Sequence, residues 1–247
     1  MKTLGDQHKL TQFQDDWKQI RPEDITRAFE CFSGSTGEYE RVTGVSFGTV
    51  TEEFVNAIKG IDLKVPGQSL CLCFGIENEV IQMFFQVNGQ GAYMPDKCLF
   101  ETIISHRKDL TEPFYGVSVD YKNEVCTNWA MIPYYSMNNV FFQTLNIQDP
   151  TTRGANSREE FLVRPGRVQL FLVQESDLVV MQKLLQPGMG LAVHFGVNYG
   201  HSVRQQIAFT PVIEIRPSGS VDTALGDDDE DPTYLDFVDP CPPNCPD

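Results

Sequence analysis

Apolar residues recur along this chain at helical spacing in some segments and at strand spacing in others. Spacings of three and four residues predict helices, whereas alternation or a short continuous apolar run predicts strands. The predicted helices cover residues 9–20, 25–32, 49–61 and 175–185. The predicted strands cover residues 70–76, 81–87, 168–173, 191–197 and 207–215. Pro211 falls inside the last of these strands, which predicts an edge strand or a bulge because proline cannot donate to a ladder.

The middle of the chain has a weaker pattern. Residues 98–106 fit a short helix, residues 115–121 alternate weakly, and residues 125–135 fit another strand. Residues 137–145 fit a helix that would correspond to the helix over 25–32.

Two runs of the sequence resemble each other. Residues 66–76 and 187–197 both read Pro-Gly-x-x-Leu-x-x-x-Phe-Gly followed by Ile or Val. A predicted helix precedes each run and an alternating segment follows it, as in a tandem repeat. The fold class predicted is therefore α+β, with two similar lobes from a tandem pseudo-repeat, each with two helices and antiparallel strands that include a hairpin. Coincidence is the alternative, because Pro-Gly turns before apolar strands are common.

This pattern divides the chain into five parts. They are an N-terminal helix (1–20), a first pseudo-repeat (21–91), connecting strands (92–136), a second pseudo-repeat (137–217) and an acidic, disordered tail (218–247).

The composition is that of a globular protein, with 41% apolar and 21% charged residues among 247. The net charge is −15, and much of it lies in residues 222–247, which contain no Lys or Arg. A mildly acidic body without a basic stripe argues against binding to nucleic acid or to anionic lipid. No stretch approaches the roughly 20 apolar residues of a membrane helix, and the N-terminus lacks the apolar core of a secretory signal. The predicted location is the cytoplasm.

The tail combines an acidic run with a short apolar peptide. Residues 227–232 are almost entirely acidic and should be extended. Tyr234, Leu235 and Phe237 follow, and would suit a docking segment for a protein partner. In the alternative, these apolar residues fold back on the body.

The cysteine count is odd at seven, and the positions are scattered, which predicts reduced thiols. Cys241 and Cys245 have a spacing that a small disulfide or half of a metal site would allow. No second pair with suitable spacing is visible, so neither a metal nor any other cofactor is predicted.

The search for catalytic motifs finds no phosphate-binding loop, nucleophile elbow or His-Glu-x-x-His sequence. Aligning the two similar runs places Cys73 opposite His194, with His201 in the loop that follows. A thiol beside an imidazole can act as a nucleophile. The alternative is that Cys73 and His194 are unrelated core residues.

An aromatic stretch covers residues 129–142 and includes Tyr134 and Tyr135. These residues would suit a recognition surface, or they would pack in the core.

Several segments resemble a group of small Bacteroidota proteins. The segments are residues 25–32, 45–61, 70–89 and the terminal Cys-Pro-Pro-Asn-Cys at 241–245. The resemblance implies a related architecture and a bacterial origin, and it implies no activity.

These observations support three functional hypotheses. The first is a non-enzymatic intracellular interaction or scaffold protein whose tail docks a partner. The second is a thiol-dependent hydrolase or transferase that uses Cys73 and His194. The third is a self-assembling structural subunit, a homo-oligomer joined through the edge strand near Pro211.

Overall fold

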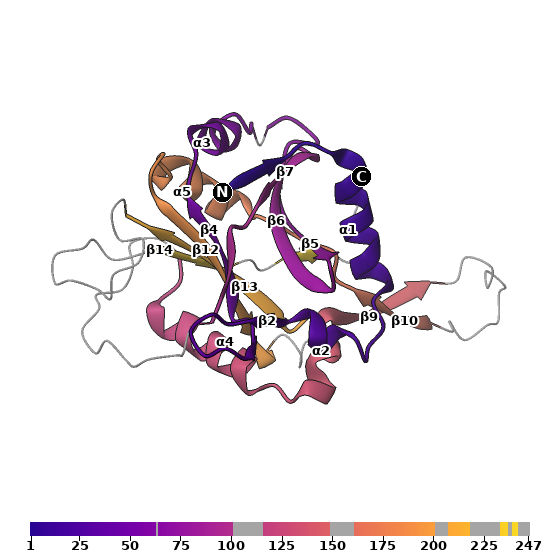
Figure 1. Cartoon of the computed structure of the whole chain (residues 1–247). Helices are drawn as coiled ribbons and strands as arrows, with labels where there is room; N and C mark the ends of the chain where they lie inside the picture. Colours follow the sequence, from indigo (N-terminus) through magenta and orange to yellow (C-terminus); the bar gives the residue numbers. More distant parts are fainter. Residues whose placement is uncertain are drawn as a thin grey trace, which may run out of the picture.

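The computed structural model describes residues 1–62, 64–100, 116–148, 161–200, 207–217, 233–236 and 239–241. In these residues the protein is α+β, with two large antiparallel sheets, two small hairpins and helices on both sides (Figure 1).

The first sheet has six strands in the order β1-β7-β6-β5-β11-β15. Its strands are β1 (Lys2–Leu4), β7 (Gln90–Met94), β6 (Val80–Val87), β5 (Leu70–Glu77), β11 (Leu170–Leu172) and β15 (Asp239–Cys241). The second sheet has five strands in the order β14-β13-β12-β4-β8. Its strands are β14 (Thr233–Asp236), β13 (Phe209–Arg216), β12 (Gly190–Val197), β4 (Gly44–Thr49) and β8 (Lys97–Leu99).

The hairpins and helices connect these strands. The two small hairpins are β2 (Glu30–Phe32) with β3 (Tyr39–Arg41), and β9 (Phe142–Gln148) with β10 (Phe161–Arg167). The helices are α1 (Gln7–Gln19), α2 (Ile25–Ala28), α3 (Glu52–Lys59), α4 (Val119–Met131), the 3-10 helix η1 (Tyr134–Phe141) and α5 (Glu175–Leu184).

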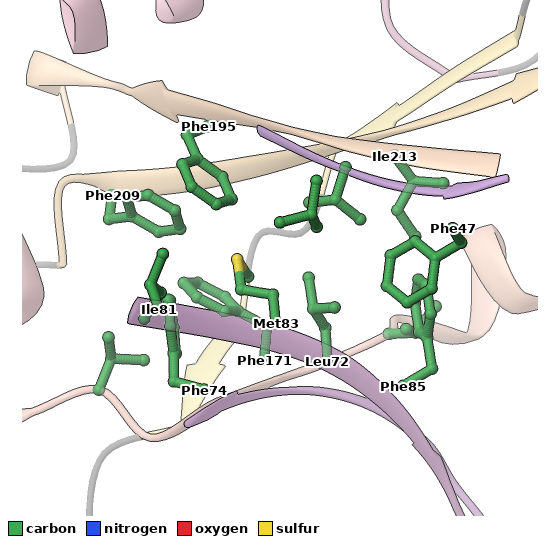
Figure 2. Close-up of a cluster of buried hydrophobic side chains, with 14 of the residues drawn as sticks. Phe47, Leu72, Phe74, Ile81, Met83, Phe85, Phe171, Phe195, Phe209 and Ile213 are labelled. Atoms are coloured by element: carbon green, nitrogen blue, oxygen red, sulfur yellow. The ribbon is translucent and has the colours of Figure 1, made fainter. Parts of the chain in front are cut away.

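The main core lies between the two sheets. Leu72 and Phe74 of β5 face Phe195 of β12 and Phe209 of β13 across this layer (Figure 2). The rings of Phe47 and Phe85 make the same connection at 4.9 Å between centroids. Aromatic residues fill this layer, and burying them supplies much of the driving force for folding.

Each sheet is covered on its outer face by one helix. Phe13 of α1 packs with Cys73 and Phe84 on the first sheet, whereas Val125 of α4 packs with Val212 on the second sheet. Figure 1 shows α1 and α4 on these opposite sides. The order of layers is therefore helix, sheet, sheet, helix, and both central strands are covered on two faces. This explains why β5 and β12 read as almost continuous apolar runs.

The two halves of the chain contribute strands to both sheets. β4 from the first half pairs with β12 from the second, and β11 from the second half pairs with β5 from the first. The strands of the two halves are therefore interleaved in both sheets.

The hairpins expected after residues 70 and 191 are confirmed as β5–β6 and β12–β13. Pro211 pairs with Phe195 inside β13, and β14 pairs with residues Val212 to Ile215 on the other side of that strand. The prediction of an edge strand is therefore wrong from Val212 onward, where the C-terminal segment covers β13. Pro211 itself lies outside that pairing, and the β12–β13 register runs through it without the alternative bulge.

Three predicted elements differ from the structure. The helix expected over 25–32 ends at Ala28, because residues 30–32 pair with residues 39–41 in a hairpin. Residues 44–49 are strand β4, and the next helix begins after Thr51, whose hydroxyl accepts the Phe54 N–H. The strand expected over 125–135 is mostly helix α4, which Ser118 caps by accepting the Tyr121 N–H.

The predictions for the middle of the chain are only partly correct. Residues 97–99 form β8 where a helix was expected from residue 98. The helix expected over 137–145 is η1 up to Phe141, followed by β9. Residues 101–115 lie outside the described part of the chain.

Candidate functional site

An exposed group of apolar side chains lies where α4 ends and η1 begins. We call Met131, Tyr134 and Tyr135 the aromatic corner. Their exposed fractions are 73%, 52% and 87%. The chain turns here because Ile132 precedes Pro133 and adopts an extended conformation (φ −59°, ψ 125°), which proline favours in the residue before it. The turn places these side chains outside the core, which supports the interpretation of Tyr134 and Tyr135 as surface residues.

Hydrogen bonds and a cation–π contact hold the aromatic corner in place. Nη1 of Arg41 donates to the carbonyl oxygens of Trp129, Ala130 and Ile132, at 3.1, 3.1 and 2.7 Å. The guanidinium carbon lies 4.4 Å from the centre of the Tyr134 ring, within cation–π range. These contacts fix the end of α4 and one tyrosine ring within the protein itself. Pre-ordering of this kind lowers the entropic cost of association.

The end of α1 resembles the end of α4 in its backbone and differs from it in its exposed side chains. α1 and α4 each have 13 residues and end at an extended isoleucine, Ile20 or Ile132. The fourth residue after α1 is Glu23, and the fourth after α4 is Tyr135. Both side chains are exposed, and the one after α1 is charged whereas the one after α4 is aromatic.

The structure separates the two residues of the predicted nucleophilic pair. The Cys73 side chain lies between the first sheet and α1, whereas His194 is on the α4 side of the second sheet. Both sheets and the main core lie between them, so the proximity expected from the alignment is not found. His201 lies outside the described residues.

The environment of Cys73 is unfavourable for a nucleophile. Its side chain is fully buried, and burial, together with the neighbouring Cys71, raises its pKa well above the usual range. The Sγ atom donates to Oε1 of Gln86 at 3.4 Å. A thiol in this environment stays protonated and inaccessible.

His194 belongs to a buried polar network that the sequence analysis did not identify. Its Nε2 lies 2.6 Å from Oε2 of Glu214, and Nη2 of Arg216 donates to the same oxygen at 2.7 Å. The hydroxyl of Tyr234 donates to the other carboxylate oxygen at 3.3 Å. Side chains alternate along β13, so Glu214 lies on the face away from the core residues Ile213 and Ile215. This alternation was the sequence feature that could have indicated the network.

The Glu214 carboxylate is stabilised in its charged form. Burial would raise its pKa, but the hydrogen bond and charge of His194, followed by those of Arg216, outweigh burial and lower the pKa to about 2. Because Glu214 is only 3% exposed, we assign this network a structural role that attaches β14 to the sheet.

Two of the three tail residues expected to dock a partner are buried in the protein itself. Tyr234 is 8% exposed and Leu235 is fully buried, since β14 pairs with β13. The interpretation of these two residues as a free docking segment is therefore wrong, and folding back is the alternative that holds. Phe237 lies outside the described residues.

Only one of the two tail cysteines lies in the part of the chain that the structure describes. Cys241 ends strand β15, which pairs with β11, and Cys245 lies outside the described residues. No group of three or more His, Cys, Asp or Glu side chains with metal-binding geometry occurs in the part of the chain that the structure describes. None of the helices described is both long enough and apolar enough to span a membrane.

Comparison with known proteins gives no match to any family model, curated protein or solved structure.

Proposed function

We propose that this protein is a non-enzymatic intracellular interaction protein that binds a protein partner through the aromatic corner. The observation that carries the proposal is the exposure of Tyr135 (87%) and Met131 (73%) beside a tyrosine that Arg41 holds in place. Tyrosine and methionine are enriched at the centres of protein interfaces, where rigid aromatic side chains contribute most of the binding free energy.

We further propose that the scaffold arose by duplication with exchange of strands. The order helix, short helix, hairpin, strand, helix, hairpin runs from α1 to β6 and again from α4 to β13. Nε1 of Trp17 donates to the Val168 carbonyl before β11, and Nε1 of Trp129 donates to the Val42 carbonyl before β4. These reciprocal contacts support two equivalent halves.

The duplication proposal strengthens the functional one. Equivalent positions in two copies meet the same structural demands, so a difference between them reflects another requirement. Of the exposed residues after α1, Arg21 and Glu23 are charged and Pro22 is apolar, whereas Met131 at the end of α4 and Tyr134 and Tyr135 after it are apolar or aromatic. Binding of a protein partner through the aromatic corner would explain this difference.

The other two hypotheses receive less support. A thiol-dependent enzyme based on Cys73 and His194 would need these residues to share a cavity, and they lie on opposite outer faces of the two sheets. Assembly through the edge near Pro211 would need an open edge on β13, which β14 occupies from Val212 to Ile215. The cytoplasmic location stays a prediction, and the absence of a disulfide at Cys31, Cys71, Cys73, Cys98 and Cys126 is consistent with it.

The proposal is tested with the variant Tyr134→Ser/Tyr135→Ser and the control Glu23→Ser, each in the full chain. Proteins that co-purify with wild type and with the control, and not with the double variant, are identified and then purified. We expect the Kd of such a protein to rise at least about 10-fold for the double variant, the scale of one well-packed interface residue. Equal affinity for wild type and the double variant would refute binding through this surface.

A further inference from the structure

Two cysteines that are distant in the sequence meet at the rim of the main core. Cys31 is in β2 and Cys98 is in β8, and their Sγ atoms are 2.9 Å apart. The chain separation is 67 residues, so no local pattern brings them together. Both side chains are partly buried and pack against the main core.

The surrounding backbone explains the proximity. The Val42 N–H donates to the Phe29 carbonyl, which fixes the base of the β2–β3 hairpin. On the other side, Cys98 pairs with Val45 in β4, and the Thr43 N–H donates to the Leu99 carbonyl. Residues 42 and 43 link the hairpin to β4, so the same short segment, residues 42–45, positions both thiols.

The two thiols have different acid–base properties. The hydrogen bond with Cys98 lowers the pKa of Cys31, whereas the same hydrogen bond, together with burial, raises the pKa of Cys98. In disulfide exchange the thiolate is the nucleophile, so the thiol that attacks first has the lower pKa and the resolving thiol the higher one. Cys31 and Cys98 differ in the same way.

Both cysteines line a surface pocket. An open pocket of about 500 Å³ is lined by Cys31, Phe32, Lys97, Cys98, Leu99 and Phe100. Its lining is mainly apolar, with the Lys97 side chain as the charged residue among the six. Cys73, by contrast, is fully buried between the first sheet and α1.

We propose that Cys31 and Cys98 form a dithiol site that a low-molecular-weight disulfide oxidises. The Cys31 thiolate attacks one sulfur of the small disulfide, which forms a mixed disulfide and releases one small thiolate. Cys98 then loses its proton to solvent, and its thiolate attacks Cys31 Sγ. The bond from Cys31 to the small molecule breaks, and the second small thiolate leaves. The protein dithiol is oxidised by two electrons, and the small disulfide is reduced to two thiols, each of which takes up a proton.

Oxidation would tie the β2–β3 hairpin to β8 at the edge of the second sheet. The covalent link would close a long loop in the unfolded chain and so restrict the unfolded ensemble. In the entropic description of such links, the melting temperature rises on the order of 10 °C for a protein of this size.

The test incubates the folded full chain with oxidised glutathione, followed by rapid alkylation and peptide mapping. We expect a Cys31–Cys98 linked peptide, the loss of two hydrogen atoms, and a higher melting temperature that dithiothreitol reverses. In Cys98→Ser, we expect glutathione to accumulate as a mixed disulfide on Cys31. In Cys31→Ser, we expect Cys98 to react no faster than the buried Cys126. The variant Cys126→Ala should behave as wild type.

The proposal is overturned if wild type reacts without forming the Cys31–Cys98 link. It is also overturned if the folded Cys98→Ser variant leaves Cys31 unmodified under these conditions. Circular dichroism of each variant confirms folding, and the wild-type peptide map decides the matter even if a variant does not fold.

Discussion

Phe29 and Phe141 stack on each other in the main core, with ring centroids 5.3 Å apart and planes inclined by 15°. Trp17 and Trp129 flank this pair, and each tryptophan contacts both phenylalanines edge-on. Phe29 follows α2 in the first half, and Phe141 ends η1 in the second. The stack therefore joins one ring from each half of the chain. The N–H groups of Val42 and Val168, just before β4 and β11, donate to the carbonyls of Phe29 and Phe141.

The tryptophan contacts predict a matched pair of destabilised variants. Trp17→Phe removes the donor to Val168, and Trp129→Phe removes the donor to Val42. Each variant leaves a buried carbonyl without its partner and a small cavity, so we expect each to lower the free energy of unfolding by about 3 kcal/mol. Urea denaturation measures both. If one substitution were neutral and the other severe, the proposed equivalence of the halves would be wrong.

Two glycines at equivalent positions of β5 and β12 lead to a second prediction about a matched pair of destabilised variants. A Cβ at Gly75 would lie 2.8 Å from Phe13 Cβ, and a Cβ at Gly196 would lie 2.7 Å from Val125 Cγ2. These glycines allow α1 and α4 to cross the sheets closely, so we expect Gly75→Ala and Gly196→Ala each to cost about 1–3 kcal/mol. Gly34→Ala is the control, since nothing lies within 4 Å of a Cβ there. Thermal unfolding of the three variants checks this, and wild-type stability for Gly75→Ala would contradict the close packing.

The same glycines show which parts of the fold could be predicted from the sequence. Phe74-Gly75 and Phe195-Gly196 were recognised as equivalent, and β5 and β12 followed from their apolar runs. Helix α4 was missed because its buried residues, Val125, Cys126 and Trp129, read as part of a strand when taken with the apolar residues after them. The Cys31–Cys98 contact and the burial of Tyr234 depend on tertiary pairing between distant strands, which no local pattern contains.

Glu214 predicts a loss of stability in acid. Its pKa is lowered from 4.5 to about 2 on folding, so its contribution is present above pH 4.5 and is lost as the pH falls toward 2. The charged form is bound by His194 and Arg216, and neutralising it removes these interactions. We expect Glu214→Gln to be less stable than wild type at pH 6, with a difference that shrinks by roughly 3 kcal/mol between pH 6 and pH 2.

Urea denaturation across this pH range measures the difference between the two proteins, which cancels the contributions of other carboxylates. A constant difference would mean that Glu214 is not held as a buried carboxylate.

The C-terminal strands predict that the tail stabilises the body. Ending the chain after Pro217 removes the buried Tyr234 and Leu235 and uncovers β13. Burial of two such side chains is worth about 4 kcal/mol, so we expect a clear fall in the melting temperature. A chain that lacks only residues 242–247 keeps β14 and β15 and serves as the control. The same melting temperature for the long truncation would contradict the pairing of β14 with β13.

The most direct test of the proposed function places a photo-crosslinking amino acid at position 135 or at position 23. Both positions are the fourth residue after their helix, and both native residues are exposed. We predict that position 135 gives a discrete adduct with a partner protein in the producing cells, and that position 23 does not. Identical adducts at both positions, or none at position 135, would contradict binding through the aromatic corner.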